Sequence, residues 1–348
     1  MSDEAKRNTT MQRRDLLRIG GAAVAAVAAG AIGPAAAEGP TATAPASPRP
    51  ALPTRNLGRT GTAVGIFSLG GQAAVEKADN ASVAVPIVER AIDLGVNYID
   101  TSARYGGEDA RWSERYIGEV MKRRRSAVFL ASKTHDRTRD GSLKHLERSL
   151  ELLHTDHLDL WQIHNLTSMD EVDRIFAKGG AVEALVAARE SKRVRFLGVT
   201  GHADPDVLLE AIRRFPFDTL LLALNAADRY RLPFAAKLLP LAVEKEMGII
   251  GMKVPGRGRL LRSWTPPPEG DRYGSKSPGT LTMKEAMRYV LTLPVSTVIV
   301  GCDSIAQLEE NVAIAREFTP LSAVQMAALE ERAEPVQRQS LFFRRWEA

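Results

Sequence analysis

The sequence contains one cysteine, Cys302, in 348 residues. A single cysteine excludes an internal disulfide and a cysteine-ligated metal cluster. The six histidines show neither a His-x-His nor a His-Glu-x-x-His spacing, so the sequence predicts no metal site. For the same reason it disfavours a metal-dependent barrel hydrolase.

A strong charge of one sign is also missing. The formal net charge is +5, and it falls to +3 when residues 1–37, with five basic and three acidic residues, are set aside. No stripe of Lys and Arg is interleaved with aromatic residues, so we expect no nucleic-acid partner. The remaining composition, 44% hydrophobic and 26% charged, is ordinary for a globular protein.

Long hydrophobic runs are absent as well. Residues 19–32 form a weakly apolar stretch that as a helix would span roughly 21 Å, short of the ~30 Å membrane core. Arg13 and Arg14 precede it, and the small residues 35–37 follow it. This order is typical of a twin-arginine export signal. We therefore expect residues 1–37 to be a signal peptide read by the export machinery, a periplasmic mature protein, and no permanent membrane span.

Three further segments follow from composition and pattern. Residues 38–53, rich in Pro, Ala, Ser and Thr, are expected to form a disordered linker. Residues 55–64 carry two turn glycines and predict a hairpin that leads a domain over residues 54–320. Residues 321–348 are predicted to form a C-terminal helix and a tail. The sequence leaves open whether that tail folds over the domain or extends freely.

Short apolar segments alternate with amphipathic ones along residues 65–300. The predicted strands are 65–69, 97–101, 128–133, 158–164, 194–200, 219–224, 249–253 and 295–300. The predicted helices between them include 82–94, 143–153, 181–191, 205–215, 235–246 and 283–293. Eight such units predict an α/β fold, a (β/α)₈ TIM barrel behind the hairpin. A doubly wound sheet is the rival, but residues 70–75 lack the later glycines of Gly-x-Gly-x-x-Gly.

Three predicted strands end on an ionisable residue: Asp100, Lys133 and His164. Strand alternation directs these side chains into one barrel mouth, and Tyr105 follows the first of them. Burying one charge alone costs several kcal/mol, so we expect an Asp100–Lys133 ion pair. A nearby ammonium is expected to lower the pKa of Tyr105 and make it a general acid. Each residue alone also has a structural explanation, as a helix cap, loop residue or core histidine.

Residues 100–106, Lys133 and the Gln162–His164 segment together resemble the aldo-keto reductase family over residues 57–318. The resemblance implies a (β/α)₈ barrel that passes hydride from a nicotinamide nucleotide, usually NADPH, to an aldehyde or ketone. It implies that Tyr105 protonates the carbonyl oxygen and that Lys133 and Asp100 set its pKa. It also implies that His164 orients the carbonyl and assists proton transfer.

The same resemblance assigns a set of residues to the nucleotide. They are Gly70, Thr101, Thr200, Gly201, Met252, Lys253, Gly256, Gly258, Gly301, Ser304, Gln307, Glu310 and Asn311. Glycines let the backbone approach phosphate, and the helix start at residue 304 suits an anion. Ser304 and Gln307 also fit a capping box, which needs no ligand.

Several usual nucleotide contacts of the family are replaced in this sequence. Gly201 occupies a position where many family members have an Asn. Leu221 replaces a Gln in the same way, and Met252 replaces an aromatic residue. Gln307 stands for an Arg that reaches the 2′-phosphate, a contact worth roughly 1.5 to 3 kcal/mol. The candidates to replace that Arg are Lys253, Arg257 and Arg259. We expect NADP(H) as cofactor, with NAD(H) also allowed.

The leading hypothesis is an exported reductase of a small-molecule carbonyl compound. Aromatic residues in the two long loops, Trp112, Trp264 and Tyr273, favour an apolar or aromatic substrate. The alternative is an exported nucleotide-binding redox sensor or partner subunit with little carbonyl turnover. Substitution of Tyr105 discriminates the two, because only the reductase needs its proton.

Overall fold

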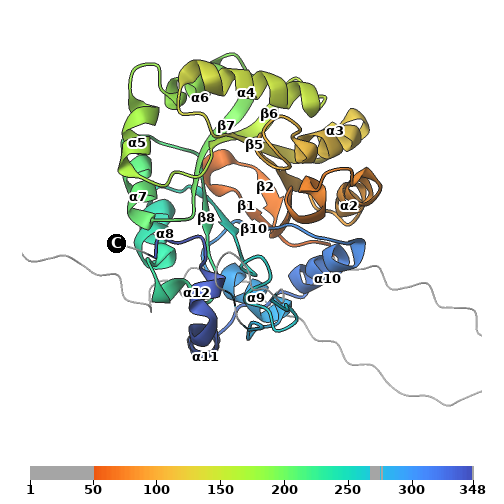
Figure 1. Ribbon diagram of the computed structural model, residues 1–348, viewed down its shortest axis with the longest axis vertical. Helices are drawn as coiled ribbons and strands as arrows, with labels where there is room; N and C mark the ends of the chain where they lie inside the picture. The colour runs from red at the N-terminus through yellow and green to blue at the C-terminus, as the bar shows by residue number, and fades with distance from the viewer. Residues whose placement is uncertain (1–50, 267–274, 276, 347–348) are drawn as a thin grey trace, which may run out of the picture. The chain divides into compact units, whose positions relative to one another are not determined.

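The computed structural model describes residues 51–266, 275 and 277–346, which fall within one compact unit (Figure 1). The predicted signal peptide and nearly all of the predicted linker lie outside the described residues, as does Tyr273. Among the described helices, none combines the length and the apolar character that crossing a membrane requires.

Eight parallel strands close into a barrel in the order β10-β3-β4-β5-β6-β7-β8-β9, so the predicted (β/α)₈ fold is confirmed. The strands are β3 (Phe67–Gly70), β4 (Tyr98–Asp100), β5 (Phe129–Thr134), β6 (Leu158–Ile163), β7 (Val194–Gly201), β8 (Thr219–Ala223), β9 (Gly248–Met252) and β10 (Thr297–Val300). In Figure 1 the helices surround this barrel. Every predicted strand is present, with ends that differ by at most two residues.

The predicted hairpin is also confirmed. Strands β1 (Thr54–Asn56) and β2 (Ala63–Gly65) pair antiparallel around the short helix η1 (Gly58–Thr60). Leu57 packs in the barrel interior, and the backbone N–H of Arg59 donates to the carbonyl of Glu246 at 2.8 Å. Because Glu246 precedes β9, the hairpin covers the amino-terminal end of the barrel and leaves the carboxyl end for the site.

Helices follow the strands around the barrel. They are α2 (Ala81–Asp93), α3 (Trp112–Arg124), α4 (Arg139–Leu152), α5 (Met169–Phe176), α6 (Ala181–Glu190), α7 (Pro205–Arg214), α8 (Phe234–Glu244), α9 (Met283–Thr292), α10 (Ile305–Arg316), α11 (Ala323–Ala333) and α12 (Gln337–Ser340). Short 3₁₀ turns are η2 (Ala73–Glu76), η3 (Arg125–Ala127), η4 (Asp228–Tyr230) and η5 (Glu334–Val336). Helix α4 starts before the predicted residue 143 because Thr138 caps it by accepting from the N–H of Gly141.

Apolar side chains form two layers. One fills the barrel: Leu57, Val64, Tyr98, Phe129, Ala131, Leu160, Leu221, Ala223, Ile250, Met252 and Ile299. The other, which includes Ile99 and Leu130, lies between strands and helices. Tyr98 and Ile99 therefore face opposite sides, as the period of two in a strand requires. The inward-facing series ends in polar residues at the carboxyl end of the barrel.

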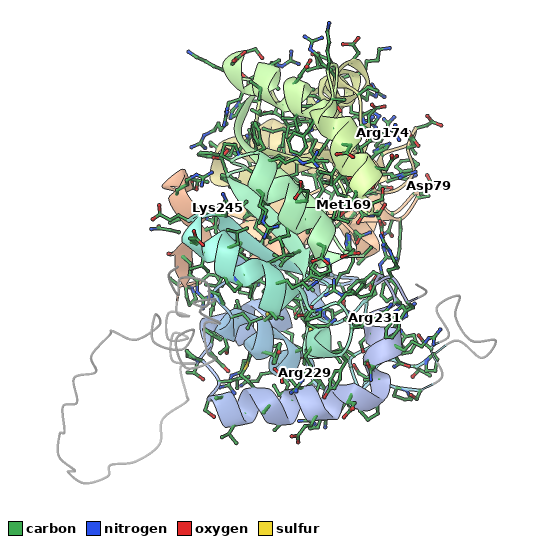
Figure 2. The ribbon with its side chains drawn as sticks, turned by 90° about the vertical axis from the view of Figure 1, so that its left-hand side faces the viewer. Asp79, Met169, Arg174, Arg229, Arg231 and Lys245 are labelled. Atoms are coloured by element: carbon green, nitrogen blue, oxygen red, sulfur yellow. The ribbon has the colours of Figure 1, made fainter. Side chains whose placement is uncertain are left out.

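The C-terminal segment folds over the carboxyl end of the barrel, which settles the question that the sequence leaves open. Phe343 packs against the inner apolar layer. Arg344 is buried, forms an ion pair with Asp228 and donates to the carbonyls of His202 at 2.6 Å and Ala223 at 3.0 Å. Helix α11 is tied to the barrel domain by an ion pair between Arg229 and Glu330 at 2.7 Å. Figure 2 shows Arg229 next to this helix.

Candidate active site

A buried ion pair stands at the carboxyl ends of β4 and β5. Asp100 and Lys133 are 2% and 1% exposed, and the Lys133 ammonium contacts Oδ2 of Asp100. The same ammonium donates to the carbonyl of Thr101 at 2.7 Å. Gln162 Nε2 donates to the other carboxylate oxygen of Asp100 at 3.2 Å. The structure thus contains the ion pair that the sequence predicts, with hydrogen bonds for both charges.

Tyr105 lies next to this pair. Its hydroxyl is 3.5 Å from Lys133 Nζ, which is 4.9 Å from the ring centroid. Burial raises the pKa of Tyr105, and the Lys133 ammonium opposes that rise without reversing it. The predicted lowering of this pKa is therefore wrong, because desolvation of the phenolate outweighs the attraction of the ammonium. Burial alone would lower the pKa of Lys133. The neighbouring Asp100 and Tyr105 raise this pKa by more than burial lowers it, so the lysine is charged.

His164 follows β6 and faces Tyr105. The two rings meet edge to face with centroids 5.8 Å apart, and His164 Nδ1 is 3.3 Å from Ser102 Oγ. Burial lowers the pKa of His164 well below its usual value, and the Lys133 charge acts in the same direction. The imidazole is therefore neutral at neutral pH. Asp100, Tyr105, Lys133 and His164 are gathered as the sequence predicts.

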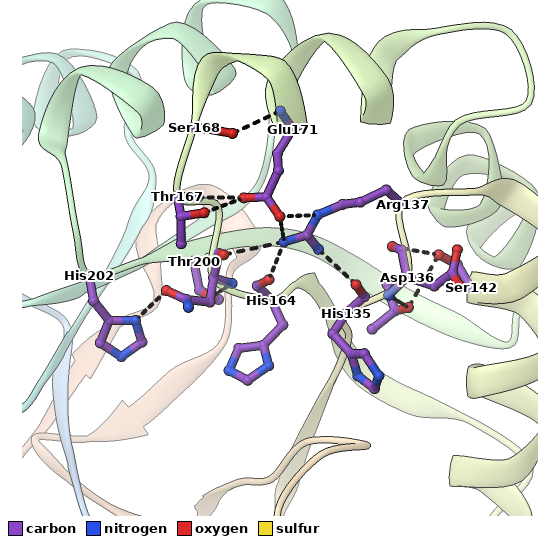
Figure 3. A network of polar contacts seen from close by, with 12 residues as sticks. His135, Asp136, Arg137, Ser142, His164, Thr167, Ser168, Glu171, Thr200 and His202 are labelled. Atoms are coloured by element: carbon purple, nitrogen blue, oxygen red, sulfur yellow. Dashed lines mark hydrogen bonds and ion pairs between the residues drawn. The ribbon is translucent and has the colours of Figure 1, made fainter. Parts of the chain in front are cut away.

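Arg137 holds the loops that carry these groups, and sequence reasoning missed it. Figure 3 shows its guanidinium between the loops after β5 and β6. It donates to the carbonyls of His164 at 3.0 Å, Asn165 at 3.2 Å and His135 at 3.2 Å, and it pairs with Glu171 at 2.8 Å. A single Arg in a loop forms no recognisable sequence motif. Its role could not be predicted because its four partners come from three separate segments of the chain.

His202 adds a second neutral imidazole above the barrel. Its Nδ1 is 2.7 Å from Asn165 Oδ1, and its ring lies edge to face with Phe343 at 5.9 Å. Burial, with a smaller contribution from the charge of Lys253, lowers the pKa of His202 well below its usual value. The C-terminal segment and the loop after β6 therefore meet at this ring.

A cavity of about 840 Å³ extends from Asp100 and Tyr105 to the start of α10. Eight of the residues that the resemblance assigns to the nucleotide line it: Gly70, Met252, Lys253, Gly258, Gly301, Gln307, Glu310 and Asn311. A second hollow, of about 640 Å³, includes Asn97 and Arg125 at the amino-terminal ends of β4 and β5. That second hollow is at the end opposite the catalytic cluster.

The other five assigned residues do not line the cavity, and three of their side chains have structural partners. Thr101 Oγ1 bonds Ser113 Oγ at 2.7 Å, and Thr200 Oγ1 accepts from the N–H of Asn165 at 2.7 Å. Ser304 caps α10 by accepting from the N–H of Gln307 at 3.2 Å. The Gln307 side chain accepts from the N–H of Asp303 at 2.8 Å, so the predicted box is shifted by one residue. Gly201 and Gly256 pack against Leu208 and the Ser340 backbone.

Residues after β3 complete the cavity, and sequence reasoning missed them too. Gln72 accepts from Lys253 Nζ at 2.9 Å, and Lys77 pairs with Asp303 at 2.7 Å. Burial, followed by the charge of Arg257, lowers the pKa of Lys253 to about 7. The available signal was the Gly70-Gly71 pair at a strand end, but of the residues in this loop the sequence analysis assigned only Gly70 to the nucleotide.

The aromatic residues expected around the substrate separate in the structure. Trp264 lines the cavity. Trp112 begins α3 and stacks on Tyr116 with centroids 5.6 Å apart, so it has a structural role. The prediction that these aromatic residues surround the substrate therefore holds for Trp264. It is wrong for Trp112, which does not line the cavity.

Comparison with known proteins agrees with this geometry. The aldo/keto reductase family model matches residues 63–272. The chain is 27% identical to the uncharacterized oxidoreductase YqkF of Bacillus subtilis (strain 168), over 77% of this chain and 92% of that one. It is 29% identical to L-galactose dehydrogenase of Arabidopsis thaliana, over 81% and 94%.

A solved structure gives the same result. The holo form of aldo-keto reductase AKR11C1 from Bacillus halodurans superposes with a TM-score of 0.67 at 25% identity, covering 81% of this chain and 96% of its own. The matched family segment contains Asp100, Tyr105, Lys133 and His164. This chain belongs to the aldo/keto reductase family and is an NAD(P)H-dependent oxidoreductase.

Proposed function

We propose that this protein transfers hydride between NADPH and an aldehyde or ketone, with Tyr105 as the general acid. The observation that carries the proposal is the position of the Lys133 ammonium, which is buried between the Asp100 carboxylate and the Tyr105 hydroxyl. A fixed cation at that point stabilises the phenolate that forms when Tyr105 gives up its proton.

Protonation states support Tyr105 over His164 as the proton donor. His164 is neutral because burial depresses its pKa, so it has no extra proton to give. Tyr105 keeps its proton at neutral pH because burial raises its pKa. A phenol with an ammonium at 3.5 Å can then protonate a carbonyl oxygen as negative charge develops on it.

His164 is proposed to orient the carbonyl. The N–H of Arg104 donates to Ser102 Oγ at 3.4 Å, which leaves the Ser102 hydroxyl free to donate to His164 Nδ1 at 3.3 Å. This arrangement favours the tautomer with the proton on Nε2. An Nε2–H group donates a hydrogen bond to the substrate oxygen without competing for the transferred proton.

The residues of the cavity fit a nicotinamide nucleotide. Lys77, Arg257 and Arg262 supply positive charge along its lining, and Lys253, with a pKa of about 7, adds to it when protonated. Positive charge there suits a pyrophosphate. A Cβ at Gly70 would lie 3.1 Å from the N–H nitrogen of Gly301, so glycine keeps the backbone open where the two strand ends meet. When bound, the nucleotide supplies the hydride, and the chain's own residues supply the proton and the orientation.

The preference for NADPH rests on these cations, and one observation favours NADH. Asp303 and Glu310 line the cavity beside Gln307, and a carboxylate there would accept from a ribose 2′-hydroxyl and repel a 2′-phosphate. Parallel fluorescence titrations decide the point: a lower Kd for NADPH supports the proposal, and a lower Kd for NADH contradicts it.

Substitution of Tyr105 tests the proposed reaction. Tyr105→Phe should lower the rate of aldehyde reduction by roughly 10² to 10⁴ and leave the Kd for NADPH unchanged. Tyr98→Phe is the matched control, because it removes a buried hydroxyl that has no hydrogen-bond partner among the described residues. A redox sensor or partner subunit would instead show little turnover before either substitution.

We also propose export by the twin-arginine route, with the nucleotide loaded before export and recycled on the protein by a second substrate. The support is the order of Arg13, Arg14 and the apolar residues 19–32. Replacement of both arginines by lysine should retain the protein in the cytoplasm, as measured by cell fractionation. An unchanged periplasmic fraction would contradict export by this route.

A further inference from the structure

Two imidazoles and a carboxylate form a cluster beside the catalytic groups. The proposed reaction does not use this cluster. Glu108 lies in the loop before α3, His135 follows β5, and His145 is on α4. One ligand atom from each lies within 4.8 Å of the other two. His135 Nε2 is 3.0 Å from Glu108 Oε1, and the two imidazole centroids are 4.3 Å apart. Two imidazole nitrogens and a carboxylate oxygen are a ligand set that zinc uses in proteins.

The hydrogen bonds around His145 leave one of its nitrogens free to coordinate. The Ser142 hydroxyl donates to the carbonyl of Asp136, and the Thr134 hydroxyl donates to Ser142 Oγ, both at 3.2 Å. Thr134 Oγ1 can therefore only accept from His145 Nδ1, also at 3.2 Å. The proton of the neutral imidazole is then on Nδ1, and Nε2 carries a lone pair. Imidazoles that bind metals are oriented by such a hydrogen bond.

His135 provides the second observation that points to a ligand. Its side chain is 11% exposed. Its Nδ1 is buried and has no hydrogen-bond partner within the described part of the chain. Nε2, at 3.0 Å from Glu108 Oε1, is the atom placed to bind a metal ion, and the free Nδ1 can carry the ring proton when it does.

Two buried arginines fix the backbone at all three positions. Arg111 donates to the carbonyls of Glu108 at 3.2 Å and His145 at 3.3 Å. Arg137 donates to the carbonyl of His135 at 3.2 Å. Their charges are already paired, Arg111 with Glu114 at 3.5 Å and Arg137 with Glu171 at 2.8 Å. The backbone of the cluster is therefore preorganised, and the charge of each of these two arginines is matched by a carboxylate.

We propose that Glu108, His135 and His145 bind one divalent transition-metal ion of the zinc class. Bonds of about 2.0 to 2.1 Å bring ligand atoms to within about 4.2 Å of each other, so a shift of under about 1 Å completes the site. Glu108 can make that shift, because its side chain is 58% exposed. The ion joins the loop that carries Tyr105 to β5 and α4.

This site departs from the expectation that the chain has no metal site. The two histidines stand ten residues apart, one after a strand and one inside a helix. Only the packing of α4 against β5 brings them together, so no short spacing in the sequence reveals them.

Metal titration of the full, untagged chain tests the proposal. After dialysis against a chelator, calorimetric titration with Zn²⁺ should give one ion per chain, and Co²⁺ should give a visible absorption band. His145→Ala should weaken Zn²⁺ binding at least 100-fold, and Glu108→Gln about 10-fold. The matched control is His157→Ala, since His157 also lies beside a carboxylate, Asp156 at 2.6 Å. It should bind Zn²⁺ as the wild type does.

Thermal melting gives a readout that does not depend on activity. Zn²⁺ at a hundred times its Kd should raise Tm on the order of 5 °C in the wild type and in His157→Ala. The metal-free His145→Ala protein should melt near the metal-free wild type, which shows that it folds, and Zn²⁺ should not raise its Tm. Wild-type affinity in His145→Ala, no binding by the wild type, or binding lost on substitution of His164 instead would each overturn the proposal.

Discussion

At the scale of single residues, Lys133 is the group on which the catalytic cluster depends. Its ammonium is shared by the Asp100 carboxylate, the Thr101 carbonyl and the Tyr105 hydroxyl. The pair is buried, so neither charge can be solvated by water when the other is removed. Removal of one partner from a buried pair is more destabilising than removal of both.

The stability of substituted proteins should show this dependence. Lys133→Met or Asp100→Asn alone should lower the free energy of unfolding by about 3 to 5 kcal/mol, because each leaves an uncompensated buried charge. The double substitution, which leaves a neutral pair, should recover most of that loss. Urea unfolding of the four proteins measures it, and additive losses in the double variant would contradict a mutual dependence.

At the scale of elements, Arg137 connects the loops after β5 and β6 with the first turn of α5. Arg137→Lys keeps the charge but not the planar fork that reaches several acceptors at once. We expect kcat/KM to fall roughly 10- to 100-fold, because the His164 loop loses its support. Arg139→Lys is the matched control, since Arg139 is 44% exposed and its one ion pair among the described residues is with its neighbour Asp140. An equal effect of the two substitutions would contradict a positioning role.

The C-terminal segment is a second element that positions the site. Arg344→Met should destabilise the protein by about 3 to 5 kcal/mol, because Asp228 would remain buried and charged. Arg345→Met should change stability by under about 1 kcal/mol, since Arg345 is 49% exposed in its ion pair with Asp204. Thermal or urea unfolding distinguishes them. Equal losses would show that the Asp228 pair does not hold the segment down.

At the scale of the whole molecule, the period of hydrophobic residues was enough to predict the barrel. Each strand is short, buried and followed by a helix, so order and topology follow from local pattern. Strand alternation also predicted that Asp100 and Lys133 meet, because both stand at the carboxyl ends of neighbouring strands. A single polar residue at the carboxyl end of an apolar strand can therefore be recognised in the sequence as a candidate site residue.

Contacts between segments distant in the sequence could not be predicted in this way. Arg137 and Arg344 are single residues in loops, and their partners come from several elements. The direction of the Tyr105 pKa also depended on burial, which the sequence does not give, and the predicted lowering was wrong for that reason. Gln72 and Lys77 line the cavity. They lie in a loop whose residue spacing matches no known motif, so the sequence did not reveal them.

The central claim is that the Asp100–Lys133 pair acts on the reaction through Tyr105. The most direct test is the single-turnover rate of hydride transfer from NADPH to an aldehyde in four proteins: wild type, Tyr105→Phe, the neutral pair Asp100→Asn/Lys133→Met, and their combination. We predict that the neutral pair lowers the rate by at least tenfold in the wild type and has no further effect once Tyr105 is Phe. Losses that multiply in the combined variant would contradict the claim.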